Sequence, residues 1–173
     1  IDSGADHADL TAEYAAIPAE MKNVAAYFGK AVLRDVDEQE FYARLADVRK
    51  AIGDRAVLRA MHFFDESRRV QMQVRALKND NFAAFLNYVN ESGNASWELL
   101  QNITPLGATA HQEMAFTLVL CRKLLGGEGA VRVHGGGFAG TVLAFVPNEQ
   151  FEQFKNAMDS AIGSGSTQKL HIQ

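Results

Sequence analysis

Hydrophobic and polar positions repeat with a helical period along most of the chain. Apolar residues three or four positions apart predict helices over about residues 10–28, 38–52, 55–77, 82–93, 109–125 and 149–162. The expected N-caps are side chains that can accept a backbone hydrogen bond: Asp9, Asp37, Asp54, Asn81, Thr109 and Asn148. Pro18 should interrupt the first helix, because proline has no amide hydrogen to donate.

The helix expected over residues 55–77 is the longest. The stripe expected to be buried on it consists of Val57, Ala60, Met61, Phe64, Ser67, Val70, Val74 and Leu77. His62 and Glu66 are four positions apart, so a hydrogen-bonded pair between them is feasible. A metal site there would need a further ligand, and no His-rich segment offers one, so a structural His–Glu pair is the preferred interpretation.

Two strand-like runs frame a glycine segment near the end of the chain. Val131 and Val133 alternate with Arg132 and His134, which is the period of a half-buried strand, and residues 142–146 are continuously apolar. The short connection between them predicts neighbouring antiparallel strands, joined through residues 135–140 and packed on helices. Residues 1–4 read as the tail of a strand and residues 169–173 as a final strand.

Helices throughout and strands concentrated at the ends predict an α+β fold, with an antiparallel β-sheet layered with about six α-helices. At 173 residues the chain suits one domain, and its composition, 47% hydrophobic and 22% charged, is that of an ordinary soluble protein. A net charge of −4 gives no support to binding of nucleic acid or of an anionic membrane. No apolar run approaches the ~20 residues of a membrane span, and there is no signal peptide. The single cysteine, Cys121, excludes an internal disulfide and fits a reducing cytoplasm.

The glycine segment is the strongest candidate for a functional site. Its residues are Gly135, Gly136, Gly137, Phe138, Ala139 and Gly140. Successive backbone N–H groups in such a turn can form a nest that binds an anion, although a tight turn without a ligand explains the pattern equally well. A Walker loop and a dinucleotide fingerprint are both excluded, because Thr141 leads into a strand and not a helix.

Residues 129–147 resemble the third, C-terminal motif of the galactokinase branch of the GHMP sugar kinases. Triple glycine followed by Phe138, between two strands and after Arg132, carries the resemblance. The family has Met, Thr, Gly and Cys at four positions where this chain departs: Val133, His134, Ala139 and Thr141. Further similar segments are Glu13-Tyr14, Leu33-Arg34-Asp35-Val36, His62 with Glu66, Glu91-Ser92 and Thr104-Pro105, so the resemblance covers essentially the whole chain.

The resemblance implies that this chain is the C-terminal domain of a longer sugar kinase of the GHMP C-terminal domain type. It nominates Tyr14 as a contact to the sugar and the loop of residues 135–140 as a wall of the active site. ATP and Mg²⁺ would be bound mainly by an N-terminal nucleotide-binding domain that this chain lacks, and sugar and ATP would meet at the interface with that domain. The catalytic base would also lie there, so neither a catalytic residue nor a metal ligand is assigned in this chain.

Two other classes of function remain open. Relatives that sense sugars and regulate without turnover keep the same fold, and the loss of both arginines that follow the family's Glu-Tyr pair permits that interpretation. The third class is a standalone interaction domain. The sequence of the parent protein would distinguish a kinase from a sensor, because only the kinase needs an intact phosphate loop and a catalytic base.

Overall fold

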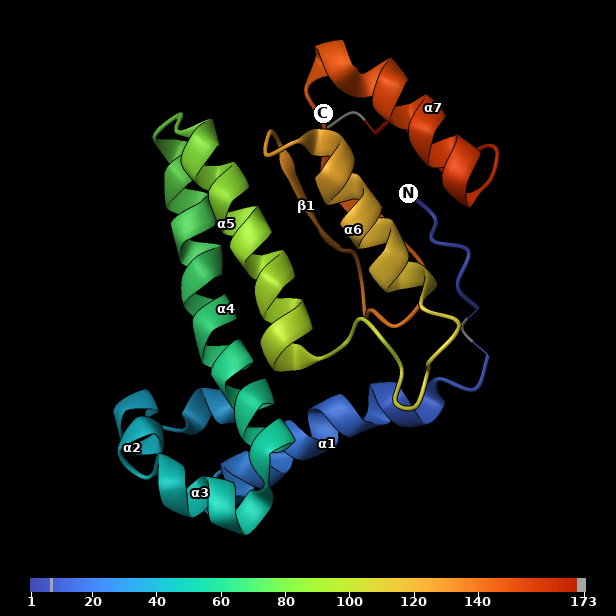
Figure 1. The fold of residues 1–173 in the computed structure, drawn as a ribbon. Helices are drawn as coiled ribbons and strands as arrows, with labels where there is room; N and C mark the ends of the chain where they lie inside the picture. The colour runs from blue at the N-terminus through green and yellow to red at the C-terminus, as the bar shows by residue number, and fades with distance from the viewer. Residues whose placement is uncertain (7, 171–173) are drawn as a thin grey trace.

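The computed structural model describes residues 1–6 and 8–170, which contain seven α-helices and a two-stranded sheet (Figure 1). The helices are α1 Thr11–Tyr27, α2 Glu38–Ala43, α3 Leu45–Ile52, α4 Asp54–Lys78, α5 Phe82–Ala95, α6 Glu113–Leu125 and α7 Phe151–Ile162. The strands are β1 Ala130–Val133 and β2 Val142–Phe145. Short helical turns cover Leu33–Asp35 and Asn148–Gln150, and a π-helix, Ser96–Leu100, extends α5. The predicted fold, helices layered on an antiparallel sheet, is confirmed.

The two strands pair as the sequence predicts. They are antiparallel, with Ala130 opposite Phe145 and Val133 opposite Val142. An isolated bridge between Asp2 and Thr141 places the start of the chain beside β2, which agrees with the strand tail expected at residues 1–4. Lys169 and Leu170 lie outside any strand, and the rest of the final strand expected over residues 169–173 falls outside the described residues.

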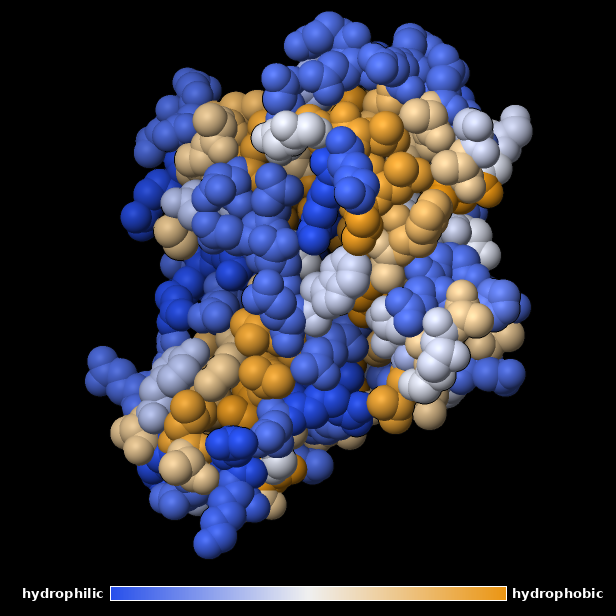
Figure 2. All heavy atoms as spheres, viewed as in Figure 1, coloured by the Kyte–Doolittle hydropathy of each residue, from blue (hydrophilic) through white to orange (hydrophobic). Residues whose placement is uncertain are grey.

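Two hydrophobic clusters stabilise the fold. The first joins the sheet to α6 and α7 and includes Val131, Leu118 and Met158. The second joins α1, α3 and α4 around Phe41 and Phe64. In Figure 1, α6 lies across the strands, while α1 runs below the lower ends of α5 and α6. Figure 2 shows hydrophobic residues gathered over α6 and, separately, over α2 and α3.

The α5 helix packs closely on β1 because Gly93 has no side chain. A Cβ atom at Gly93 would lie only 2.7 Å from the carbonyl oxygen of Val131 and 3.2 Å from Arg132 Cα. The sequence predicted that this helix ends around residues 91–93, which is wrong, since α5 runs through Gly93 to Ala95. The glycine permits close packing here and does not end the helix.

Several predicted helix boundaries are also wrong. Asp9 has φ +62° and makes no cap, and Pro18 lies inside an α1 that continues to Tyr27. Thr109 lies in a loop, and α6 begins only at Glu113. The N-cap positions expected at Asp54 and Asn148 are at Gly53 and Gln150 instead. The caps at Asp37 and Asn81 are confirmed, because their carboxylate and amide oxygens accept from the backbone N–H groups of Glu40 and Ala84 at 2.8 and 3.0 Å.

The stripe predicted to be buried on the long helix α4 is buried along only its first half. Val57, Ala60 and Phe64 are buried as predicted. Val70, Val74 and Leu77 are about half exposed, at 50%, 47% and 49%, and Ser67 is exposed too, so the prediction of a continuous buried stripe is wrong. The segment expected as one helix over residues 38–52 is likewise divided into α2 and α3 at Arg44. None of the described helices is both long and apolar enough to cross a membrane.

Candidate functional site

The glycine loop has an exposed tip with unusual backbone angles. Gly135 and Gly137 have φ values of +78° and +83°, whereas Gly136 between them has a negative φ. Alternating signs of φ in consecutive residues are the pattern of an anion-binding nest, in which successive N–H groups converge. Gly135 and Gly136 are exposed, and their N–H groups donate to no acceptor in the described part of the chain. The tip can therefore offer two backbone donors to an anion.

The inner part of the same loop is buried and anchors it. Phe138 and Ala139 are each 3% exposed and pack with Leu10 in a small hydrophobic cluster. Phe138 has φ +59°, a conformation that a bulky residue adopts only where its surroundings hold it. Of the six predicted loop residues, Gly135 and Gly136 thus face solvent, while Phe138 and Ala139 fix the loop to the protein.

Tyr14 lies directly against the glycine loop, although 123 residues separate it from Gly137. Its hydroxyl donates a hydrogen bond of 2.8 Å to the carbonyl oxygen of Gly137, and its ring meets that of Phe138 edge to face at 5.5 Å. Burial raises the pKa of the Tyr14 hydroxyl, so the group stays protonated and can donate. The structure therefore brings together the two sites that the sequence nominated. A contact from Tyr14 to sugar stays a prediction.

The neighbouring Glu13 organises the loop that precedes α6. Its carboxylate accepts a hydrogen bond of 2.8 Å from the backbone N–H of Leu106. The Glu-Tyr pair thus holds two segments at once, because Glu13 binds the loop around Leu106 while Tyr14 binds the glycine loop.

Sequence reasoning missed Asn102, which holds the glycine loop from another side. Asn102 is 3% exposed. Its side-chain Nδ2 donates to the carbonyl oxygen of Gly136 at 3.0 Å, and its backbone carbonyl oxygen accepts from the N–H of Phe138 at 2.6 Å. The one sequence signal was a polar residue directly before Ile103, which by itself does not point to the glycine loop.

A buried ion pair fixes the segment that carries Asn102. Arg59 of α4 is 1% exposed and binds Glu20 of α1 at 2.9 Å, while its Nε donates to the carbonyl oxygen of Leu100 at 3.1 Å. Burial lowers the pKa of the Arg59 guanidinium, and the charge of Glu20 partly opposes that effect. Gln101 follows in the left-handed conformation, φ +56°, and turns the chain beneath the glycine loop.

The predicted His62–Glu66 pair is absent from the hydrogen bonds of the described residues. Glu66 instead accepts from the hydroxyl of Ser92 at 2.5 Å and pairs with Arg69 and Arg132. His62 is buried, and its Nδ1 has no hydrogen-bond partner in the described chain. Burial lowers the pKa of His62, with Glu66 acting against it. The prediction fails because the Glu66 carboxylate is occupied by the Ser92 hydroxyl and by two guanidinium groups.

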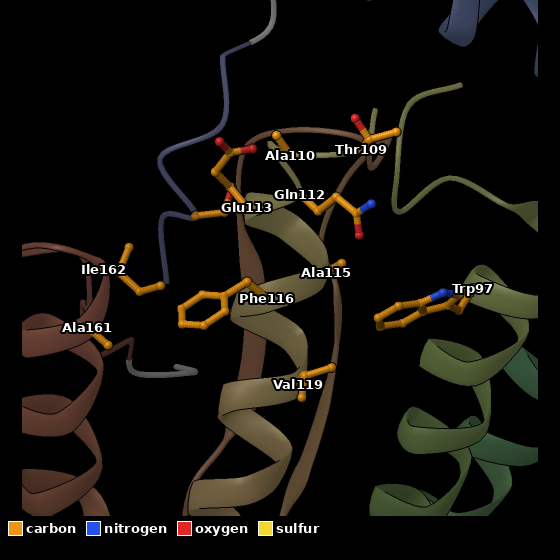
Figure 3. A pocket seen from close by; sticks show the side chains of 11 residues that line it. Trp97, Thr109, Ala110, Gln112, Glu113, Ala115, Phe116, Val119, Ala161 and Ile162 are labelled. Carbon is orange, nitrogen blue, oxygen red and sulfur yellow. The ribbon is translucent and has the colours of Figure 1, made fainter. Parts of the chain in front are cut away.

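A large cavity lies beside α6 and not at the glycine loop. It measures about 670 Å³, and in Figure 3 Trp97 and Phe116 reach toward it from neighbouring helices, with Val119 below and Ile162 at one side. Apart from Glu113, its labelled side chains carry no charge (Figure 3). Within residues 1–6 and 8–170, no group of three or more His, Cys, Asp or Glu side chains is placed to hold a metal ion. The polar backbone geometry at the glycine loop is the better candidate for chemistry.

Comparison with known proteins confirms the predicted resemblance. No protein-family model matches the chain. It is 30% identical over 155 residues to a galactokinase of Glaesserella parasuis and 26% identical to one of Haemophilus influenzae, in each case over 90% of the chain. A crystal structure of Lactococcus lactis galactokinase complexed with galactose matches 93% of the chain with a TM-score of 0.73 at 21% identity, which shows the shared fold. The chain spans only 38% of the length of these curated relatives and 40% of the crystallised chain.

Proposed function

We propose that this chain is the C-terminal domain of a galactokinase-like sugar kinase. The whole protein would transfer the γ-phosphoryl group of ATP to the anomeric hydroxyl of galactose or a related sugar, in the cytoplasm. The observation that carries the proposal is the exposed nest at Gly135 and Gly136, held by Tyr14 in a chain homologous to galactokinases over 90% of its length.

The glycine loop fits a phosphate group. Phosphoryl transfer depends mainly on positioning and on stabilising the charge that spreads over the phosphoryl oxygens. The N–H groups of Gly135 and Gly136 are unpaired within the described chain and exposed, so they can donate to such oxygens without a prior bond having to break. ATP would supply the phosphoryl group. Mg²⁺ would be held by the nucleotide and by an N-terminal domain, because the described residues offer no cluster of ligands.

The sugar would lie beside Tyr14, at the interface with the proposed N-terminal domain. A sugar hydroxyl at this position could donate to the oxygen of the tyrosine hydroxyl, whose one hydrogen is donated to the carbonyl oxygen of Gly137 at 2.8 Å. One hydroxyl would then touch both the sugar subsite and the phosphate loop. The catalytic base is assigned to the N-terminal domain, so the residues described above bind and orient but transfer no proton.

The test compares the longer protein with the 173-residue chain. We expect the longer protein to phosphorylate galactose with ATP, and the isolated chain to show no activity above a mock preparation. Tyr14→Phe in the longer protein should raise the KM for sugar more than the KM for ATP. Galactose binding by the longer protein without turnover would replace the kinase by a sugar sensor. Turnover by the isolated chain would contradict the division of roles between the two domains.

A further inference from the structure

The glycine loop is held by hydrogen bonds to two of its carbonyl oxygens. Tyr14 donates to the carbonyl of Gly137, and Asn102 donates to the carbonyl of Gly136. Because each peptide unit is planar, a donor that fixes the Gly136 carbonyl also fixes the N–H of Gly137 in the same unit. Asn102, which holds the Gly136 carbonyl, therefore anchors the peptide unit that directly follows the exposed N–H groups of Gly135 and Gly136.

The fit between Asn102 and the loop is tight. A Cβ atom at Gly137 would lie 2.1 Å from the backbone carbonyl oxygen of Asn102 and 2.5 Å from the side-chain Nδ2 of Asn102, so only glycine leaves room for both groups. The Asn102 carbonyl also accepts from Phe138 at 2.6 Å, which makes two hydrogen bonds between one residue and the loop. Its Oδ1 is buried and has no partner in the described chain. Since that oxygen contributes no bond there, the amide nitrogen is the functional half of the side chain.

We propose that Asn102 is a positioning residue for the glycine loop, whose Nδ2 donor aims the backbone N–H groups of Gly135 and Gly136 at the transferred phosphate. The expected effect on catalysis rests on the proposed kinase function, whereas the expected effect on the loop does not. An asparagine is suited to the task because it donates at every pH and brings no charge close to a bound phosphate.

Asn102→Asp is the sharpest test because it keeps the shape and replaces only the donor. When the introduced carboxyl is ionised it can only accept, so it repels the carbonyl oxygen of Gly136, which lies 3.0 Å from Nδ2 in the native chain. When it is protonated it can donate again. Burial and this repulsion both favour the protonated form, so the defect should be small at low pH and grow as the pH rises.

The matched control is Asn90→Asp. Asn90 makes the same kind of contact at the other end of β1, where its Nδ2 donates to the carbonyl oxygen of Gly129 at 3.2 Å and its Oδ1 accepts from Val131 at 3.0 Å. The Asn90→Asp variant should lower the thermal stability as Asn102→Asp does, and it should leave the glycine loop unaffected.

Two measurements separate the inference from the function on which it rests. In the isolated chain, amide hydrogen exchange at Phe138, whose buried N–H donates to the backbone carbonyl of Asn102 at 2.6 Å, should quicken in Asn102→Asp at pH 8 relative to pH 5.5, after correction for intrinsic rates, and should not change in Asn90→Asp. In the longer protein, Asn102→Asp should lower kcat/KM at least about 10-fold at pH 8, with part of the loss recovered toward pH 6.

Each outcome decides something different. An inactive wild-type longer protein would remove the kinase function but leave the exchange result standing. An active wild type together with unchanged exchange and kinetics in Asn102→Asp would overturn the inference. If Asn102→Asp does not fold at any pH, Asn102→Ala takes its place, since it removes the donor without adding charge. Native exchange at the loop in that variant would equally overturn the inference.

Discussion

Gly136→Ala should damage the site through Tyr14. The Cβ atom of the alanine would lie 2.9 Å from Tyr14 Cε1 and 3.3 Å from Cδ1, whereas ordinary contacts begin at 3.4 Å. The Tyr14 ring must therefore move by roughly half an ångström, which is enough for overpacking to destabilise the folded chain. Because Gly136 has a negative φ, alanine fits the backbone itself, and any loss comes from the contact with the ring.

The expected magnitude follows from two opposing effects. Overpacking typically costs about 1–3 kcal/mol. Replacing glycine by alanine at a compatible backbone position returns about 0.4–1 kcal/mol through the unfolded chain. We therefore expect the free energy of unfolding to fall by roughly 0.5–2 kcal/mol. In the longer protein, displacement of Tyr14 should lower kcat/KM by at least ~10-fold, equal to about 1.4 kcal/mol of transition-state stabilisation.

Urea denaturation of the 173-residue chain gives the stability term, and a double-mutant cycle identifies its cause. Gly136→Ala, Tyr14→Ala and the double variant should be non-additive by about 1 kcal/mol, because removing the ring relieves the overlap. Strictly additive effects would show that the ring is not the obstacle. A lower Tm with normal kinetics in the longer protein would leave the loop a structural turn and remove the main support for the proposed site.

Three further outcomes test the structure around the site. Glu20→Gln should lower the free energy of unfolding by about 3 kcal/mol, because it leaves the buried Arg59 guanidinium without a counter-charge, and urea denaturation measures the loss. Because the pKa of His62 is lowered in the folded chain, the unfolded chain takes up a proton more readily, and stability should fall as the pH drops below 6.5, the pKa of the unfolded histidine. His62→Gln should flatten that part of a curve of Tm against pH. Gly93→Ala should reduce Tm by several degrees, since its Cβ meets the fixed backbone of Val131 at 2.7 Å; an unchanged Tm would show that α5 can retreat from β1.

The sequence predicted well where local chemistry decides the structure. The period-two run at Val131 and Val133, the glycine connection and the apolar run after it gave the correct antiparallel pair. Asp37 caps α2 as expected, because an acceptor side chain just before a helix satisfies an otherwise unpaired N–H whatever the rest of the fold does.

The errors arose where contacts between distant segments decide. Val70 and Leu77 repeat with a helical period, but α5 covers a different side of α4 and leaves them half exposed. Glu66 has a histidine one turn away in its own helix, yet Ser92 and Arg132 from other elements take its carboxylate. Asn102 belongs to no local sequence motif. Its partners at the glycine loop lie more than thirty residues further along the chain, so nothing near it in the sequence indicates the contact.

The contacts of the glycine loop also bear on the order in which the molecule folds. Tyr14 and Ser3 reach the loop across 123 and 137 residues of chain. Closing a loop of that length costs on the order of 4 kcal/mol of chain entropy before any contact rewards it, whereas the α4–α5 hairpin closes over three residues. Long-range contacts of this kind form late, so substitutions at Tyr14 or Gly137 should speed unfolding and leave the folding rate nearly unchanged. In a chevron plot their effect would fall on the unfolding arm, and the region proposed for phosphate contact would be the first part of the native structure to open.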